Sequence, residues 1–160
     1  MELSRERFEK IYKLYSQELI NISYGYTKNF DDSFDIVQNA FYKLFTSNKK
    51  FKTNNDEKYW LIRVTINESK DFLRKKKKTT IVDTEVLDII QKDSKNNNEK
   101  IQLLKMLIRK LPEKYKSVII LHYYDLLPIK EISIILNISE NAVKKRLERA
   151  RKMLKEEMEE

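Results

Sequence analysis

The sequence predicts an all-α protein made of two small helical domains joined by a flexible linker. Among its 160 residues are one glycine, Gly25, and two prolines, Pro112 and Pro128, far fewer turn-forming residues than sheet proteins use. Apolar residues recur at steps of three and four, the period of amphipathic helices. A polar stretch at residues 93–98 has little to bury and separates two such helical segments.

The first predicted domain covers residues 1–78. Apolar residues at helical spacing predict helices at about residues 5–28, 33–46 and 57–76. Ser4 is a suitable N-cap for the first helix, and Asp31 and Asp32 stand where acidic side chains favour the start of the second. The third helix ends in four lysines, Lys75–Lys78, more positive charge than a helix end needs. This excess and the net charge of +8 indicate a partner that carries phosphates or another acidic surface.

A linker is predicted over residues 79–100, where the charge of the chain changes. Residues 59–80 carry seven basic and two acidic side chains, whereas residues 81–100 carry three basic and five acidic ones. A short helix around Val86–Ile90 is expected to interrupt this linker. The polar composition of the remainder predicts a flexible connection.

The second predicted domain covers residues 101–160. Its first helix is expected to end at Pro112, with a buried face made of Ile101, Leu104, Ile108 and Leu111. The next helix, at about residues 113–124, is predicted to bury Tyr115, Val118, Ile119 and His122. His122 is interpreted as a core histidine. With one histidine and no cysteine, the sequence predicts neither a metal site nor a cofactor.

The last two predicted helices form a helix-turn-helix. A helix over Ile129–Leu136 is followed by the turn Asn137–Ser139 and by a long basic helix from Glu140. Asparagine tolerates the left-handed conformation that such a turn requires, and Ser139 is the expected N-cap of the long helix. This spacing is typical of DNA-binding helix-turn-helix units.

A helical projection divides the long basic helix into two faces. The residues predicted to face the core are Val143, Leu147, Ala150 and Leu154. The residues predicted to face outward are Asn141, Lys144, Lys145, Glu148, Arg149 and Lys152. Side chains of these outward types read bases in the major groove. The alternative is a solvated helix in which Lys144 and Glu148 merely form an i, i+4 pair.

Two segments resemble parts of the sigma-70 family of RNA polymerase sigma factors. LPEKYKSVIILHYYDLLPIKEISIILNISENAVKKRLERARKML is similar to region 4, while DDSFDIVQNAFYKLF and KYWLIRVTINESKDFLRKKKK are similar to region 2. Nothing between them resembles region 3, which is the layout of the extracytoplasmic-function (ECF) subgroup. Pro128, Ser133 and Asn137 depart from the residues usual in region 4, and Glu148 leaves the base preference open.

The resemblance implies a transcription initiation factor that takes core polymerase to promoters. Residues 1–78 would bind the β′ clamp and the minus-ten element, and residues 101–160 the β flap and the minus-thirty-five element. The implied polymerase-binding residues are Asp35, Gln38, Asn39 and Tyr42. The implied minus-ten residues, which need stacking surface and positive charge, are Lys49, Lys50, Phe51, Lys52, Tyr59, Trp60 and Asn67. Trp60 is equally well explained as a core residue. An anti-sigma factor is a further possible partner.

Two alternative functions are weaker. A helix-turn-helix regulator that binds duplex operator DNA without polymerase would leave the region 2 pattern without a use. A nuclease with Asp31, Asp32 and Asp35 as metal ligands is disfavoured, because acids at a helix start are explained by the helix dipole. We therefore expect no enzymatic activity. With no apolar stretch long enough to span a bilayer, we expect a cytoplasmic protein without membrane insertion.

Overall fold

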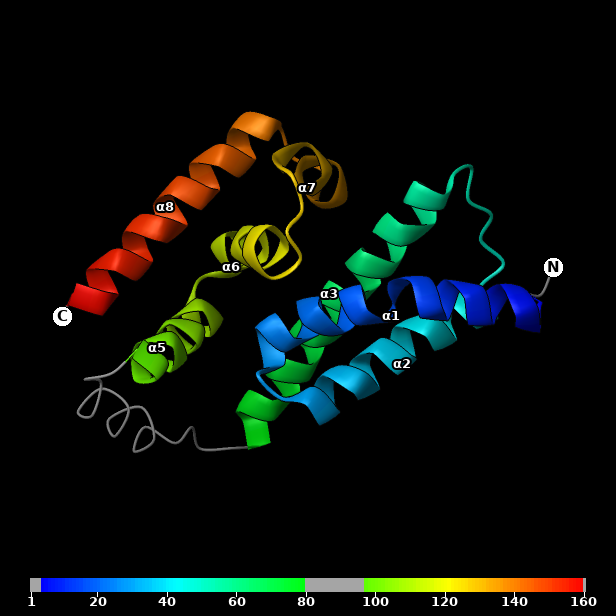
Figure 1. The fold of residues 1–160 in the computed structure, drawn as a ribbon, viewed down its shortest axis with the longest axis horizontal. Helices are drawn as coiled ribbons and strands as arrows, with labels where there is room; N and C mark the ends of the chain where they lie inside the picture. Colours follow the sequence, from blue (N-terminus) through cyan, green and yellow to red (C-terminus); the bar gives the residue numbers. More distant parts are fainter. Residues whose placement is uncertain (1–3, 80–96, 160) are drawn as a thin grey trace.

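The computed structural model describes residues 4–79 and 97–159, and all regular structure within them is helical (Figure 1). The first domain is a bundle of α1 (Arg5–Thr27), α2 (Phe30–Thr46) and α3 (Asn54–Thr79). The second contains α5 (Asn97–Lys110), α6 (Glu113–Ile119), the π-helical turn η1 (Ile120–Tyr124), α7 (Ile129–Leu136) and α8 (Glu140–Glu159). The all-α prediction is confirmed.

Local capping explains where the first three helices begin. Ser4 Oγ accepts a hydrogen bond from Arg7 N at 3.2 Å, which confirms the predicted cap of α1. α2 begins three residues earlier than predicted because Asn29, not the acidic pair, is its cap: Asn29 Oδ1 accepts from Asp32 N at 2.9 Å. Thr53 Oγ1 likewise accepts from Asp56 N at 3.1 Å, so α3 also begins earlier. Asp31 and Asp32 lie within the first turn of α2.

The second domain differs from the prediction at its first helix. α5 begins at Asn97, so the last residues assigned to the linker are helical. Ile108 and Leu111 are buried as predicted, but Ile101 is 48% exposed and Leu104 is half-buried. Leu103 and Leu107 are buried as well, so the buried face is turned relative to the prediction. The predicted short helix at Val86–Ile90 and most of the predicted linker lie outside the described residues.

The helix predicted over residues 113–124 is α-helical in its first half and π-helical in its second half. α6 gives way at Ile120 to the π-helical turn η1, a form that inserts an extra residue and often marks a functional region. Val118 and Ile119 are buried as predicted, but Tyr115 is only half-buried. His122 is also half-buried, and its Nδ1 lies 3.1 Å from the carbonyl oxygen of Leu127.

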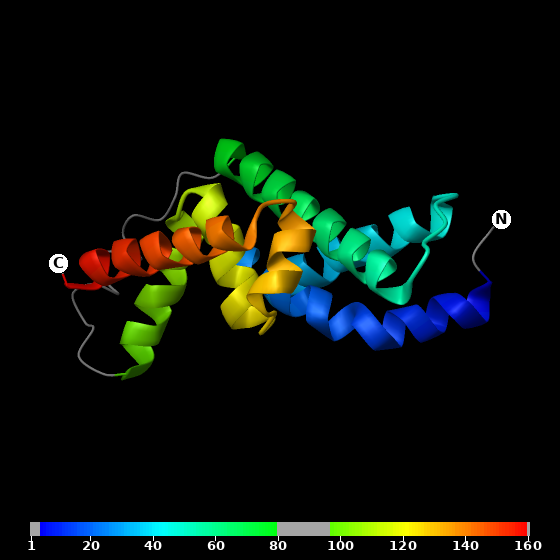
Figure 2. The same ribbon diagram turned by 90° about the horizontal axis from the view of Figure 1, so that it is seen from above.

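The two domains pack directly on each other and share one apolar core (Figure 2). α1 lies against η1 and α5, and α3 lies against α7. Gly25 makes the closest approach: a Cβ atom at this position would stand 2.9 Å from Cγ2 of Ile120. The single glycine of the sequence therefore lies where α1 must let another helix come close.

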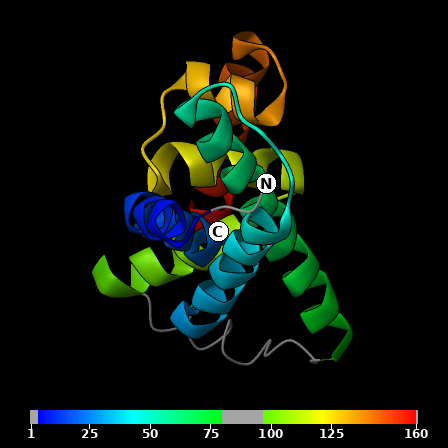
Figure 3. The same cartoon turned by 90° about the vertical axis from the view of Figure 1, so that its right-hand side faces the viewer.

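Hydrogen bonds fix the register between the domains. Figure 3 shows α7 beside the first turns of α3, where Tyr59 donates from its hydroxyl to Glu131 Oε1 at 3.1 Å. Arg63 donates to two carbonyl oxygens at the end of α7, at 2.8 Å to Ile135 and 3.1 Å to Ile134. The Ile134 carbonyl oxygen also accepts from the backbone nitrogen of Asn137, the C-cap of α7, at 3.3 Å, so Arg63 adds a side-chain donor to the capped end of this helix.

A half-buried charge cluster lies at the same contact. Lys58 Nζ is 3.3 Å from Glu18 Oε1, and Asp125 and Glu131 also face this lysine. Burial, followed by a hydrogen bond and repulsion from Glu18, raises the pKa of Asp125 to about 9. Two carboxylates can share a hydrogen bond only if one keeps its proton. The raised pKa favours the protonated form of Asp125, the form that can donate to Glu18.

Replacing Gly25 with alanine tests the close approach. Alanine in a helix interior is favoured by about 1 kcal/mol over glycine, so a gain in stability is expected if nothing crowds the position. We expect Gly25→Ala to lower the free energy of unfolding instead, because the new methyl group meets Ile120. Urea unfolding measures this change. As a control, Ile120→Ala should cost less in the Gly25→Ala background than in the wild type, whereas additive effects would contradict the contact.

Replacing Asp125 with asparagine tests the shared proton. The folded chain holds a proton on Asp125 that the unfolded chain loses above about pH 4, so this group makes stability fall between about pH 4 and pH 9. Asparagine donates to Glu18 without titrating, so Asp125→Asn should be more stable than the wild type at pH 8. Thermal unfolding across this pH range measures the difference.

The effect of Asp125 is obtained by subtracting the stability of the wild type from that of Asp125→Asn at each pH, because another group also titrates in this range. Burial, with Lys105 and Arg109 nearby, lowers the pKa of Lys28 to about 7, so Lys28 makes stability rise above pH 7 in both chains. A constant difference between Asp125→Asn and the wild type from pH 4 to pH 9 would show that Asp125 ionises normally.

Candidate nucleic-acid and polymerase interfaces

The predicted helix-turn-helix is formed by α7 and α8. Asn137 has φ 56° and ends α7 in the left-handed conformation, as predicted. The backbone nitrogen of Ile138 donates to the carbonyl oxygen of Ser133 at 3.1 Å, which closes the turn. Ser139 Oγ accepts from Ala142 N at 3.0 Å and caps α8. The turn residues thus set the angle at which α8 leaves the domain.

The two faces of α8 are those that the helical projection predicts. Val143, Leu147, Ala150 and Leu154 are buried against the rest of the second domain. All six residues predicted to face outward are exposed: Asn141, Lys144, Lys145, Glu148, Arg149 and Lys152. An exposed helix of this composition that follows a tight turn is suited to insertion into the major groove of duplex DNA.

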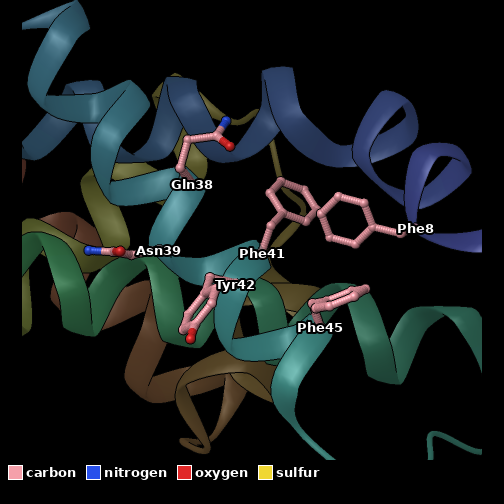
Figure 4. Close-up of a pocket in the computed structure, with 6 residues that line it drawn as sticks. All are labelled: Phe8, Gln38, Asn39, Phe41, Tyr42 and Phe45. Carbon is pink, nitrogen blue, oxygen red and sulfur yellow. The ribbon is translucent and has the colours of Figure 1, made fainter. Parts of the chain in front are cut away.

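An apolar groove lies between α1 and α2 (Figure 4). It has a volume of about 450 Å³ and is lined by Phe8, Gln38, Asn39, Phe41, Tyr42 and Phe45. Tyr42 is 66% exposed and Phe45 is 42% exposed, so large rings stand open to solvent. Gln38 Nε2 donates to the Tyr12 hydroxyl at 2.7 Å, which holds the amide at the groove.

The groove contains three of the four predicted polymerase-binding residues. Gln38, Asn39 and Tyr42 line it, whereas Asp35 is exposed on the same helix but is not among the lining residues. Three lining residues lie outside the predicted set: Phe8, Phe41 and Phe45. Phe8 follows the helical period of α1, so the sequence alone does not distinguish it from an ordinary core residue, yet its ring meets Phe45 edge-on with centroids 5.5 Å apart.

The loop before α3 forms a small aromatic and cationic cluster. The rings of Phe51 and Trp60 lie with centroids 5.8 Å apart, and Lys49 Nζ is 5.7 Å from the Trp60 ring. Both rings are half-buried, so each keeps some surface open to solvent. Lys49, Lys50, Lys52 and Asn67 are exposed. Both rings also pack against the hydrophobic core, so a core role and a stacking role for Trp60 both stay open.

Tyr59 does not join this cluster. Its side chain is 7% exposed, and its hydroxyl donates to Glu131 of α7. Burial and this hydrogen bond to Glu131 raise the pKa of its phenol. Tyr59 was expected to offer a stacking surface, but in this arrangement of the domains its ring is enclosed by α7. Adjacent residues of a helix point about 100° apart, so Tyr59 and Trp60 face different neighbours.

The acidic residues considered as metal ligands are not gathered into a site. Asp32 lies 3.7 Å from Lys76 Nζ, while Asp31 and Asp35 are exposed. In residues 4–79 and 97–159, no three histidine, cysteine, aspartate or glutamate residues are placed to hold a metal ion. Within the same ranges, no helix combines the length and apolarity needed to cross a bilayer.

The sequence matches two family descriptions in chain order. Residues 11–79 match "Sigma-70 region 2", and residues 101–154 match "Sigma-70, region 4". The first match contains the aromatic cluster and all groove residues except Phe8, and the second contains the helix-turn-helix. Together they cover well over half of the chain.

Curated relatives are similar over nearly the whole chain. "RNA polymerase sigma factor SigV" of Bacillus subtilis (strain 168) is 32% identical, over 88% of this chain and 84% of the relative. "ECF RNA polymerase sigma factor SigW" of the same organism is 30% identical, over 96% of this chain and 90% of the relative.

Solved structures share the fold of both domains. CnrH, solved in complex with the cytosolic domain of CnrY, is 19% identical with a TM-score of 0.72, over 98% of this chain and 90% of that chain. The sigma factor RpoE, solved with the anti-sigma factor NepR from Bartonella quintana, is 18% identical with a TM-score of 0.66, over 93% of this chain and 94% of that chain.

Proposed function

This chain belongs to the sigma-70 family and to its ECF type. From this premise, we propose that three of its surfaces have separate roles in promoter recognition. The groove of α1 and α2 docks on core RNA polymerase, the aromatic cluster before α3 holds the unpaired minus-ten strand, and α8 reads the minus-thirty-five duplex. The observation that carries this proposal is that both sigma regions occur in order, each with an exposed surface suited to its role.

The polymerase-docking role rests on exposed apolar rings. Tyr42 and Phe45 remain open to solvent beside the amides of Gln38 and Asn39. An apolar surface with a few polar groups is typical of a protein interface, where aromatic residues are enriched. The β′ clamp of core polymerase is the proposed partner. Of the three groove residues outside the predicted set, Phe8 and Phe45 extend the contact and Phe41 is buried.

The minus-ten role rests on stacking surface next to positive charge. An unpaired strand needs aromatic faces for its bases and cations for its phosphates. Phe51 and Trp60 supply rings, while Lys49, Lys50 and Lys52 supply charge. Asn67 is exposed farther along α3. Tyr59 is left out of the proposed contact because it is bound to α7.

The chain itself is proposed to carry out no bond chemistry and to act in the cytoplasm. It would supply sequence recognition to the polymerase, which performs the synthesis. An operator-binding regulator without polymerase remains the weaker candidate, because it would not use the α1–α2 groove. The solved neighbours were crystallised with CnrY and with the anti-sigma factor NepR, so an anti-sigma factor is a proposed further partner.

The docking role predicts that the exposed ring of Tyr42 contributes to binding core polymerase. Tyr42→Ala should weaken co-purification with core by about tenfold, because tyrosine is enriched among the few interface residues whose truncation costs more than about 1 kcal/mol. Phe30→Ala is the matched control: Phe30 lies on the same helix, is 65% exposed and stands outside the groove. Circular dichroism verifies that both variants fold. If Tyr42→Ala and Phe30→Ala lose the same amount of binding to core polymerase, the groove is not the docking surface.

The minus-ten role predicts that Trp60 acts in strand opening. In reactions of core polymerase with the chain on fragmented genomic DNA, the wild type should give transcripts with defined starts. Trp60→Ala should reduce the permanganate reactivity of unpaired thymines more than it reduces closed-complex formation in a gel shift. A lost stacking contact of about 1–3 kcal/mol corresponds to a loss of roughly 5- to 150-fold in opening.

Tyr59→Phe is the matched control for Trp60. It keeps the ring and removes only the hydrogen bond to Glu131, so opening should change much less. If core polymerase alone gave the same defined transcripts, the proposed sigma function of this chain would be wrong. Normal opening by Trp60→Ala would make Trp60 a purely structural residue.

A further inference from the structure

A basic pocket lies between the first turn of α6 and the first turns of α8. It has a volume of about 190 Å³ and is lined by Lys114, Tyr115, Ala142, Lys145, Arg146 and Arg149. Four of these six residues are cations, and none of the described residues that line the pocket is acidic. Lys114, Tyr115 and Arg146 were not singled out as binding residues by the sequence.

The Tyr115 hydroxyl organises the pocket. A hydrogen bond from Arg149, followed by one from Lys114, lowers the pKa of the Tyr115 phenol. Lys114 Nζ also lies 5.0 Å from the centre of the Tyr115 ring. Arg149 of α8 and Tyr115 of α6 line the same pocket, so Arg149 lies on the side of α8 that borders α6.

The positive charge of the pocket is not balanced by nearby carboxylates. Among the described residues, none of the four cations lies within 4.0 Å of a carboxylate oxygen. The neighbouring acid, Glu113, is engaged elsewhere: it accepts from the Tyr26 hydroxyl at 3.1 Å and lies 3.4 Å from Lys70 Nζ. An anion in the pocket would relieve the repulsion among its cations.

The position of the pocket divides the outward face of α8 into two edges. At 100° per residue, the edge next to α6 carries Ala142, Lys145, Arg146 and Arg149. The opposite edge carries Asn141, Lys144, Glu148 and Lys152. Base-reading side chains must reach freely into the groove, whereas phosphate contacts lie at its border. The second edge is therefore the one that can read bases.

We propose that this pocket binds one backbone phosphate of the DNA duplex that α8 enters. Arg149 is then a sequence-independent phosphate contact, and Tyr115 is the residue that positions it. The inference rests on the proposed minus-thirty-five role of α8 and assigns the chemistry of one edge of that surface. Arginine suits this task because its planar guanidinium can donate to Tyr115 and to a phosphate oxygen together.

The test compares two DNA duplexes that bind the full chain with different affinity. One is a 30-base-pair duplex enriched from a random library by binding to the wild-type chain, and the other is a scrambled duplex of the same composition. Fluorescence anisotropy gives the dissociation constant for each duplex over a range of salt concentrations. Circular dichroism verifies the fold of each variant.

Arg149→Ala should weaken binding to both duplexes by the same factor. Losing one phosphate contact lowers the salt slope by about one, which corresponds to about an eightfold loss at 0.1 M salt. Tyr115→Phe removes the hydroxyl that positions Arg149, so it should cause a smaller loss, again equal on both duplexes and with a lower salt slope. A purely structural role of Tyr115 would leave the salt slope unchanged.

Asn141→Ala is the matched control on the opposite edge. It should weaken binding to the enriched duplex only and leave the salt slope unchanged. If Arg149→Ala also weakens only the enriched duplex, Arg149 reads a base and the phosphate pocket is wrong, although α8 still binds DNA. If neither Asn141→Ala nor Arg149→Ala changes binding to either duplex, the proposed minus-thirty-five role of α8 fails as well.

Discussion

The close approach of Gly25 to Ile120 is the constraint on which the arrangement of the two domains depends. A glycine in a helix interior costs about 1 kcal/mol relative to alanine, and α1 carries it at the point where η1 crosses. The space that a side chain would fill is occupied by the isoleucine. Because the helices meet there without a gap, Ile22 and Tyr26 of the first domain share one core with Ile120 and Leu121 of the second.

Polar contacts around this core fix the orientation of the domains. Lys58 stands among three carboxyl groups, those of Glu18, Asp125 and Glu131, and the raised pKa of Asp125 lessens the repulsion among them. Arg63 donates to carbonyl oxygens at the end of α7. Such contacts are directional, so they select one register where apolar packing alone would tolerate several.

The same orientation decides which surfaces stay available. The outward face of α8 and the groove of α1 and α2 lie away from the contact between the domains and remain exposed. α3 makes contacts on two sides. Trp60 faces the loop that precedes α3, while Tyr59 and Arg63 face α7. The minus-ten surface and the contact between domains are therefore adjacent on one helix.

The sequence by itself determined the helices, the helix-turn-helix and the two faces of α8. These features depend on local rules: capping by Ser4 and Ser139, the left-handed turn at Asn137 and the 3.6-residue period. Only the tertiary structure decided that Tyr59 is enclosed, that Phe8 and Phe45 border a groove, and that Arg149 and Tyr115 line one pocket. Each of these outcomes depends on a residue far away in the sequence, and a helical period shows which face a residue occupies but not which helix covers that face.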